Sequence, residues 1–215
     1  MHQYEQHQKG FETMSTKRNN QSIYKLVITA IFVALTAFLQ LFASSFTVGA
    51  VSFSIVLIPI VLCGILAGPI SGAICGLTFG VITMIGGLTG GDLFTATLMQ
   101  TGTRGFITTT LICLVKATAA GLVSALVYKA LKEKNGFVAV VCAAATAPIV
   151  NSALFVLGCL TMTDILSQTF TSGASVIEFL IFVCVGVNFI VEFLVNLVFA
   201  PAIYHLIKAT SKGKI

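Results

Sequence analysis

The sequence has few charged residues and no tryptophan. Only 9% of its 215 residues are charged, while 57% are hydrophobic. A soluble domain carries about 25% charged residues, because water must hydrate its surface. This shortage of charge excludes an ordinary soluble protein. It indicates a multi-pass membrane protein with one integral domain and no soluble catalytic domain.

Sequence motifs for nucleotide binding and hydrolysis are also absent. The chain contains neither GxxxxGK[ST] nor HExxH, so we expect no phosphate-binding P-loop and no zinc-protease site. His205 falls at the expected cytoplasmic end of the last apolar run, and the sequence supports no Ser–His or Cys–His pair. We therefore expect no enzyme activity, no cofactor and no bound metal.

The six cysteines form no CxxC motif and no Cys/His cluster. Each lies in or beside an apolar stretch, which favours small buried thiols over a disulfide framework or a zinc site. These residues are Cys63, Cys75, Cys113, Cys142, Cys159 and Cys184.

Apolar runs recur along the chain and are separated by short connections. A membrane-spanning helix needs about 20 mostly apolar residues, and we predict an all-α membrane protein with six transmembrane helices. The expected spans are residues 24–43, 53–67, 69–88, 114–131, 137–161 and 176–208. A disordered cytoplasmic tail (1–22) would precede the transmembrane domain (23–210), and a short cytoplasmic tail (211–215) would follow it.

The net charge of +5 arises from basic residues beside the ends of apolar runs, so we expect no nucleic-acid partner. Lysine and arginine near span ends mark the cytoplasmic side. With six spans, three basic groups fall on one side, which predicts that both termini are cytoplasmic. The groups are Lys17, Arg18 and Lys25, then Lys129, Lys132 and Lys134, and finally Lys208, Lys212 and Lys214.

Polar side chains within apolar spans are costly and need a partner or a water-filled cavity. Lys116 would either reach the outer headgroups or bind an anionic solute. Asn151 follows Pro148 and would serve helix packing or ligand binding. Asn188, Glu192 and Asn196 are spaced by four residues and share a helical face. Glu192 would either pair with Lys116 as a structural lock or line a polar cavity.

Residues 89–113 are rich in glycine and read as a long outer loop. Long loops in compact domains are usually functional or disordered. Gln100 and Arg104 in this segment are candidates for a lid, and they would equally suit a solvated loop.

Small residues recur at helical spacing in two places. Glycines stand at every fourth position from residue 64 to residue 80, which predicts close packing within a helical hairpin or a face for a partner subunit. In the first span, Ala30 and Ala34 form a second small-xxx-small pair.

The order and spacing of these segments resemble the substrate-binding S components of energy-coupling factor (ECF) vitamin transporters, over almost the whole chain after the leader. The segment from Ala30 to Ala34 is similar to the AxxxA motif of that family's first helix. The segment from Gly64 to Gly76 resembles its glycine-rich second and third helices.

Pantothenate-type S components show the strongest resemblance. Asn151-Ser152 resembles their fifth-helix Asn-Thr segment, and the stretch from Asn188 to Glu192 resembles their sixth-helix Asn/Glu pattern. Lys116 stands where those proteins carry arginine, so a planar bidentate donor is replaced by a point charge.

The resemblance implies an S-component-like bundle in the plasma membrane of a prokaryote, which binds a vitamin from outside. A transmembrane coupling subunit, docked on Ala30 and Ala34, and two ATPase subunits would drive uptake. Lys116 would bind a carboxylate, and Gln100 and Arg104 would help close the lid. The implied substrate-binding residues are Lys116, Asn151, Asn188, Glu192, Gln100 and Arg104.

Three other functions stay open at this point. The solute could be riboflavin or another vitamin, although the absence of tryptophan leaves only phenylalanine to stack on a large flat ring. The chain could be a solitary secondary transporter in which Glu192 couples to an ion. An intramembrane enzyme is disfavoured because no catalytic pair is visible.

Overall fold

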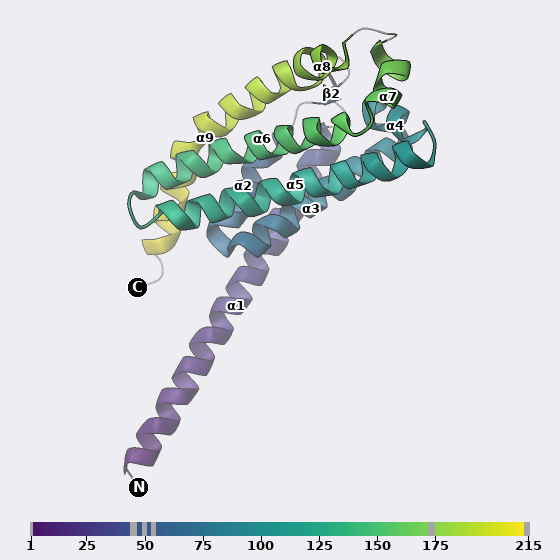
Figure 1. The fold of residues 1–215 in the computed structure, drawn as a ribbon. Helices are drawn as coiled ribbons and strands as arrows, with labels where there is room; N and C mark the ends of the chain where they lie inside the picture. The colour runs from purple at the N-terminus through teal and green to yellow at the C-terminus, as the bar shows by residue number, and fades with distance from the viewer. Residues whose placement is uncertain (1, 44–46, 49–50, 53–54, 172–174, 213–215) are drawn as a thin grey trace.

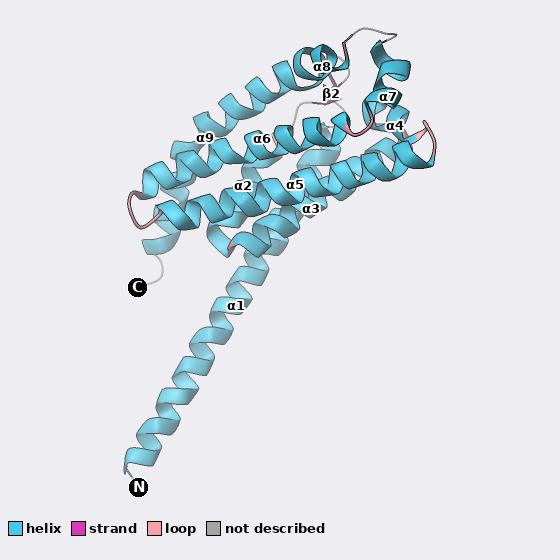
Figure 2. Cartoon of the chain, in the orientation of Figure 1, coloured by secondary structure: helices cyan, strands magenta, loops and turns pink. Residues whose placement is uncertain are grey.

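The computed structural model describes residues 2–43, 47–48, 51–52, 55–171 and 175–212 of the chain. Helices account for nearly all of these residues (Figure 2). The elements are, in order, α1 (His2–Ala43), β1 (Thr47–Val48), β2 (Val51–Ser52), α2 (Leu57–Ala67), α3 (Pro69–Thr89), α4 (Leu93–Met99), α5 (Thr103–Leu131), α6 (Gly136–Leu160), α7 (Thr163–Leu166), the π-helix η1 (Ser167–Thr171), α8 (Val176–Glu178), the π-helix η2 (Phe179–Gly186) and α9 (Val187–Lys212).

Five helical stretches among the described residues are long and apolar enough to cross a membrane. They are Gln21–Phe42 within α1, Pro69–Thr89, Thr103–Leu131, Gly136–Leu160 and Val176–Ala209. The chain is therefore an α-helical bundle of the multi-pass membrane class, as its composition predicts. The strands β1 and β2 form one short antiparallel pair between α1 and α2.

Helix α2 is shorter than the second predicted span. Its 11 residues rise about 16 Å, roughly half of the hydrocarbon thickness of a bilayer. Most of α2 is buried, and it lies inside the bundle next to α3 and α5 (Figure 1). Residues 53–54, which the prediction placed at the start of this span, lie outside the described residues.

Helix α1 begins far earlier than the first predicted span. It starts at His2, and its first half projects away from the bundle (Figure 1). The sequence predicts a disordered tail here, whereas the structure continues the helix; no proline interrupts the chain between its two ends. The division of the chain into tails and a binding domain stays a prediction.

The glycine repeat packs α2 and α3 against α5. A Cβ on Gly72 would lie 2.6 Å from the carbonyl oxygen of Gly121, and one on Gly80 would lie 2.5 Å from that of Cys113. Gly64, Gly72, Gly76 and Gly80 are buried, so the alternative of an exposed partner face is wrong for these four glycines. Backbones in this bundle approach closely because no side chain separates them.

The predicted outer loop is largely helical. Asp92 caps α4, since its carboxylate accepts a hydrogen bond from the Thr95 amide at 3.1 Å. Gly102 then turns the chain with φ of 107°, a value that glycine adopts without strain. Helix α5 consequently starts at Thr103, about three turns before the predicted start of the fourth span.

Candidate functional site

Three polar side chains predicted for the site come together between α5, α6 and α9. Asn151 on α6 and Lys116 on α5 both lie close enough to the Glu192 carboxylate to influence it electrostatically. Glu192 is only 3% exposed and Asn151 only 6% exposed. A buried carboxylate is costly unless neighbouring charges and donors stabilise it. These three side chains, together with Asn188 on α9, are the polar cluster.

The polar cluster contains acceptor atoms that no protein group satisfies. Glu192 Oε2, Asn151 Oδ1 and Asn188 Oδ1 are buried and have no hydrogen-bond partner in the described part of the chain. Asn188 lies one helical turn before Glu192 on the same face. Unsatisfied buried polar atoms call for bound water or a ligand.

Lys116 does not form a direct ion pair with Glu192. Among the described residues, the recorded ion pairs are Arg104–Asp164 and Lys132–Glu133. The Lys116 ammonium instead lies 4.9 Å from the centre of the Phe155 ring, in a cation–π contact. The structural-lock alternative, which requires a Lys116–Glu192 contact, is therefore not what this structure contains.

Sequence reasoning missed an aromatic cluster beside Lys116. The distance between ring centroids is 5.8 Å for Phe155 and Phe94 of α4, and 5.0 Å for Phe94 and Phe170 of η1. It is 5.5 Å for Phe170 and Phe179 of η2. These four rings form an apolar cover next to the Lys116 ammonium. No sequence signal brings them together, because they come from four separate elements.

One further group in this region, Thr109, was also missed, whereas Asn196 lies on the predicted polar face of α9. Thr109 is 3% exposed and its hydroxyl has no partner; it stands seven residues before Lys116, which places both on one face of α5. Asn196 is buried four residues after Glu192 and donates to the Glu192 backbone carbonyl at 2.8 Å. Helical spacing from Lys116 would have identified Thr109.

Arg104 and Gln100 lie apart from the polar cluster. Arg104 stands 12 positions before Lys116, about 18 Å along α5, and Gln100 is exposed at the end of α4. The Arg104 guanidinium donates to the Asp164 carboxylate and to the Thr161 carbonyl, both at 2.7 Å. It therefore ties the start of α5 to the α6–α7 turn, and a direct solute contact is unsupported for both residues.

The π-helix η2 ends directly before the polar cluster. It covers Phe179–Gly186 and leads into Asn188 through Val187. Extended π-helix is rare and occurs mostly at functional sites, because it leaves backbone groups out of the regular α-helical ladder. The distortion thus coincides with the unsatisfied side chains of α9.

The fold and the cluster define a class: a helical membrane protein with a charged, incompletely satisfied site between three helices. No protein-family model matches the chain, and no curated protein or solved structure shows significant similarity to it. The resemblance to S components therefore rests on the sequence motifs.

Proposed function

We propose that this protein is a membrane-embedded binder of a small anionic solute and works as the S component of an ECF vitamin transporter, with pantothenate as the favoured solute. The observation that carries the proposal is the polar cluster: a lysine, an asparagine and a glutamate meet in an apolar bundle with acceptor atoms unsatisfied. Such sites are typical of solute pathways in membranes.

The chemistry of the polar cluster suits a solute with a carboxylate, hydroxyl groups and an amide. The Lys116 ammonium would bind the carboxylate, and solute hydroxyl groups would donate to Glu192. The carboxamides of Asn151 and Asn188 offer both donors and acceptors. Phe155 would keep the Lys116 ammonium in position and cover the solute from the apolar side.

The outer face of α1 supports the proposed coupling partner. Ala30 and Ala34 are exposed, whereas Phe32, Thr36 and Gln40 of the same helix are buried. A transmembrane coupling subunit would dock on the small-residue face, and two separate ATPase subunits would drive transport. Six crossings, cytoplasmic termini and a prokaryotic plasma membrane belong to this proposal.

Calorimetry in lipid nanodiscs with a vitamin panel tests the proposal. We expect a carboxylate-bearing vitamin to bind, and Lys116→Ala and Glu192→Gln to weaken it at least tenfold. Lys134→Ala and Glu133→Gln are matched controls, because both residues are exposed in the α5–α6 connection. Unchanged affinity in Lys116→Ala and Glu192→Gln, or no binding across the panel, would contradict the proposal.

Two specific observations favour a second candidate each. The four phenylalanine rings beside Lys116 suit a flat aromatic solute such as riboflavin, and the vitamin panel decides this. The buried Glu192 would suit an ion-coupled solitary transporter. Solute uptake into vesicles that lack any ATPase, abolished by Glu192→Gln, would favour that transporter over the S component.

A further inference from the structure

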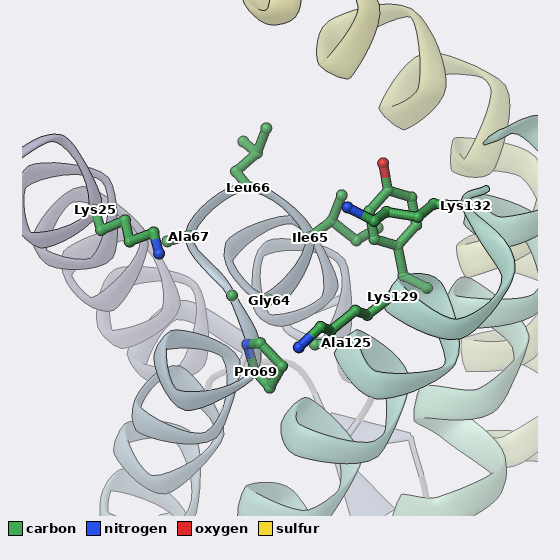
Figure 3. Close-up of a pocket in the computed structure, with 11 residues that line it drawn as sticks. Lys25, Gly64, Ile65, Leu66, Ala67, Pro69, Ala125, Lys129 and Lys132 are labelled. Atoms are coloured by element: carbon green, nitrogen blue, oxygen red, sulfur yellow. The ribbon is translucent and has the colours of Figure 1, made fainter. Parts of the chain in front are cut away.

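A pocket lies at the C-terminal end of α5, whereas the polar cluster lies near the middle of that helix. It has a volume of about 290 Å³, and its lysine on α5, Lys129, is 13 positions from Lys116, about 20 Å along the helix. Its lining comes from α1, the α2–α3 hairpin and the end of α5 (Figure 3). We refer to it as the basic pocket.

The basic pocket is strongly cationic. Lys25, Lys129 and Lys132 line it, and no acidic residue does. Lys132 pairs with the mostly exposed Glu133, at 3.6 Å. No ion pair is recorded for Lys25 or Lys129 within the part of the chain that the structure describes. The pocket thus carries a surplus of positive charge.

The lysines surround an open turn. Lys25 approaches the α2–α3 turn near Ala67, and Lys129 approaches it near Pro69 from the other side (Figure 3). A Cβ added to Gly68, at the turn itself, would meet no atom within 4 Å. Space for a ligand group therefore lies between the ammonium groups.

Compensation of a helix dipole explains only part of this arrangement. Lys129 and Lys132 stand at the C-terminal end of α5, where cations stabilise the helix. Lys25 belongs to α1, which continues to Ala43, so no helix end accounts for its position. Three ammonium groups from two helices around one hollow are what an anionic group requires.

The surroundings of the basic pocket indicate a lipid. Exposed apolar side chains flank its lysine and its turn: Leu26 follows Lys25 and is 71% exposed, and Ile70 follows Pro69 and is 76% exposed. Such residues suit contact with acyl chains, and basic pockets between helices at the cytoplasmic side bind anionic headgroups. We propose that the basic pocket binds the phosphate of an anionic phospholipid. This proposal is independent of the solute site.

Lipid titration followed by native mass spectrometry tests the proposal. The full chain in detergent is offered phosphatidylglycerol or phosphatidylcholine with identical acyl chains. We expect one phosphatidylglycerol to be retained with at least fivefold preference, and Lys25→Ala or Lys129→Ala each to lower that affinity about fivefold. Lys129→Arg should retain it, and Lys134→Ala, outside the basic pocket, should not change it.

Separate arms of the experiment distinguish the source of the phosphate. Equal retention of the two lipids by the wild-type chain would overturn the proposal without needing any variant. Inorganic phosphate at millimolar concentration should not displace the lipid. Specific binding of inorganic phosphate without phosphatidylglycerol preference would also overturn it, in favour of a soluble phosphorylated ligand. The affinity of a variant is interpreted only if its melting temperature in detergent equals that of the wild type.

Discussion

Glu192 is the residue whose burial is hardest to explain by folding alone. It is 3% exposed, and one carboxylate oxygen has no partner among the residues that the structure describes, so the side chain loses hydration without full compensation. Residues kept at a cost to stability commonly serve function. Removing the charge should therefore separate stability from binding.

We predict that Glu192→Gln leaves the melting temperature unchanged or raises it by a few degrees, because a neutral amide is cheaper to bury. Solute affinity should still fall at least tenfold. Thermal unfolding in detergent and calorimetry measure the two effects, with Glu133→Gln as the exposed control. A Glu192→Gln protein that melts well below the wild type would instead assign Glu192 a structural role.

Phe155 is the second informative residue, because its ring holds the Lys116 ammonium at 4.9 Å. A partly desolvated cation–π contact contributes about 1 to 2 kcal/mol. Phe155→Leu should therefore weaken solute binding by about fivefold or more, because Lys116 loses its fixed position. The control is Phe182→Leu, because Phe182 is 73% exposed. Calorimetry that gives equal affinities for both variants would contradict this prediction.

The glycine repeat decides packing at the scale of the helix. A Cβ on Gly72 would lie 2.6 Å from the Gly121 carbonyl oxygen, whereas one on Gly86 of the same helix would meet only Asp92 Cβ, at 4.0 Å. We predict that Gly72→Ala destabilises the protein by about 1 to 3 kcal/mol through overpacking. Gly86→Ala should be neutral or stabilising by up to about 1 kcal/mol.

Unfolding by increasing concentrations of a denaturing detergent measures the stability of both glycine variants. Equal stability of Gly72→Ala and Gly86→Ala would mean that α3 and α5 separate easily. That result would contradict the prediction that close packing of α3 against α5 excludes a side chain at Gly72.

The Arg104–Asp164 pair joins α5 to α7 at the end of the bundle opposite the basic pocket. The two side chains are 61% and 53% exposed, so their coupling in a double-mutant cycle should not exceed about 1 kcal/mol. If the pair holds the α4 and α7 region closed, Arg104→Ala should accelerate solute dissociation several-fold with little change in melting temperature. Stopped-flow dissociation that is unchanged in Arg104→Ala would reject a lid role.

Elements whose ends have local sequence signals could be predicted, whereas features that depend on contacts between distant residues could not. Pro69 and Asn135 mark the starts of α3 and α6 locally, and both helices lie within one residue of prediction. Helix α4 was missed because neighbouring glycines outweighed the Asp92 cap. The π-helix η2 has no local signature. The Arg104–Asp164 pair and the phenylalanine cluster are long-range contacts that spacing along the chain does not encode.

The site residues could likewise be predicted from the sequence, but their convergence in the fold could not. Helical spacing placed Asn188 and Glu192 on one face of α9, and chemistry singled out Lys116 and Asn151. Their convergence depends on how α5, α6 and α9 pack. Arg104 was assigned to a lid over the site because its segment was interpreted as one long loop, whereas it lies at the start of α5, about 18 Å along the helix from Lys116.

At the scale of the whole molecule, the number of membrane crossings depends on the short helix α2. The basic pocket brings the start of the apolar part of α1, the α2–α3 turn and the end of α5 to one end of the bundle. Phe137 of α6 and Tyr204 of α9, 5.5 Å apart, place the C-terminal part of α9 beside the α5–α6 connection (Figure 1). Since α1 leaves this end and α3 starts from it, the chain must return through α2 and the residues before it.

We therefore predict an even number of crossings, with both termini on the cytoplasmic side despite the length of α2. Epitope tags at the C-terminus and after Lys134 should be protected from protease in intact spheroplasts, and a tag after Gly91, in the exposed α3–α4 turn, should be cleaved. Permeabilised cells provide the control for cleavage of every tag. A protease-accessible C-terminus with a protected N-terminus would mean an odd number of crossings. In that case the segment containing α2 would not return the chain across the bilayer.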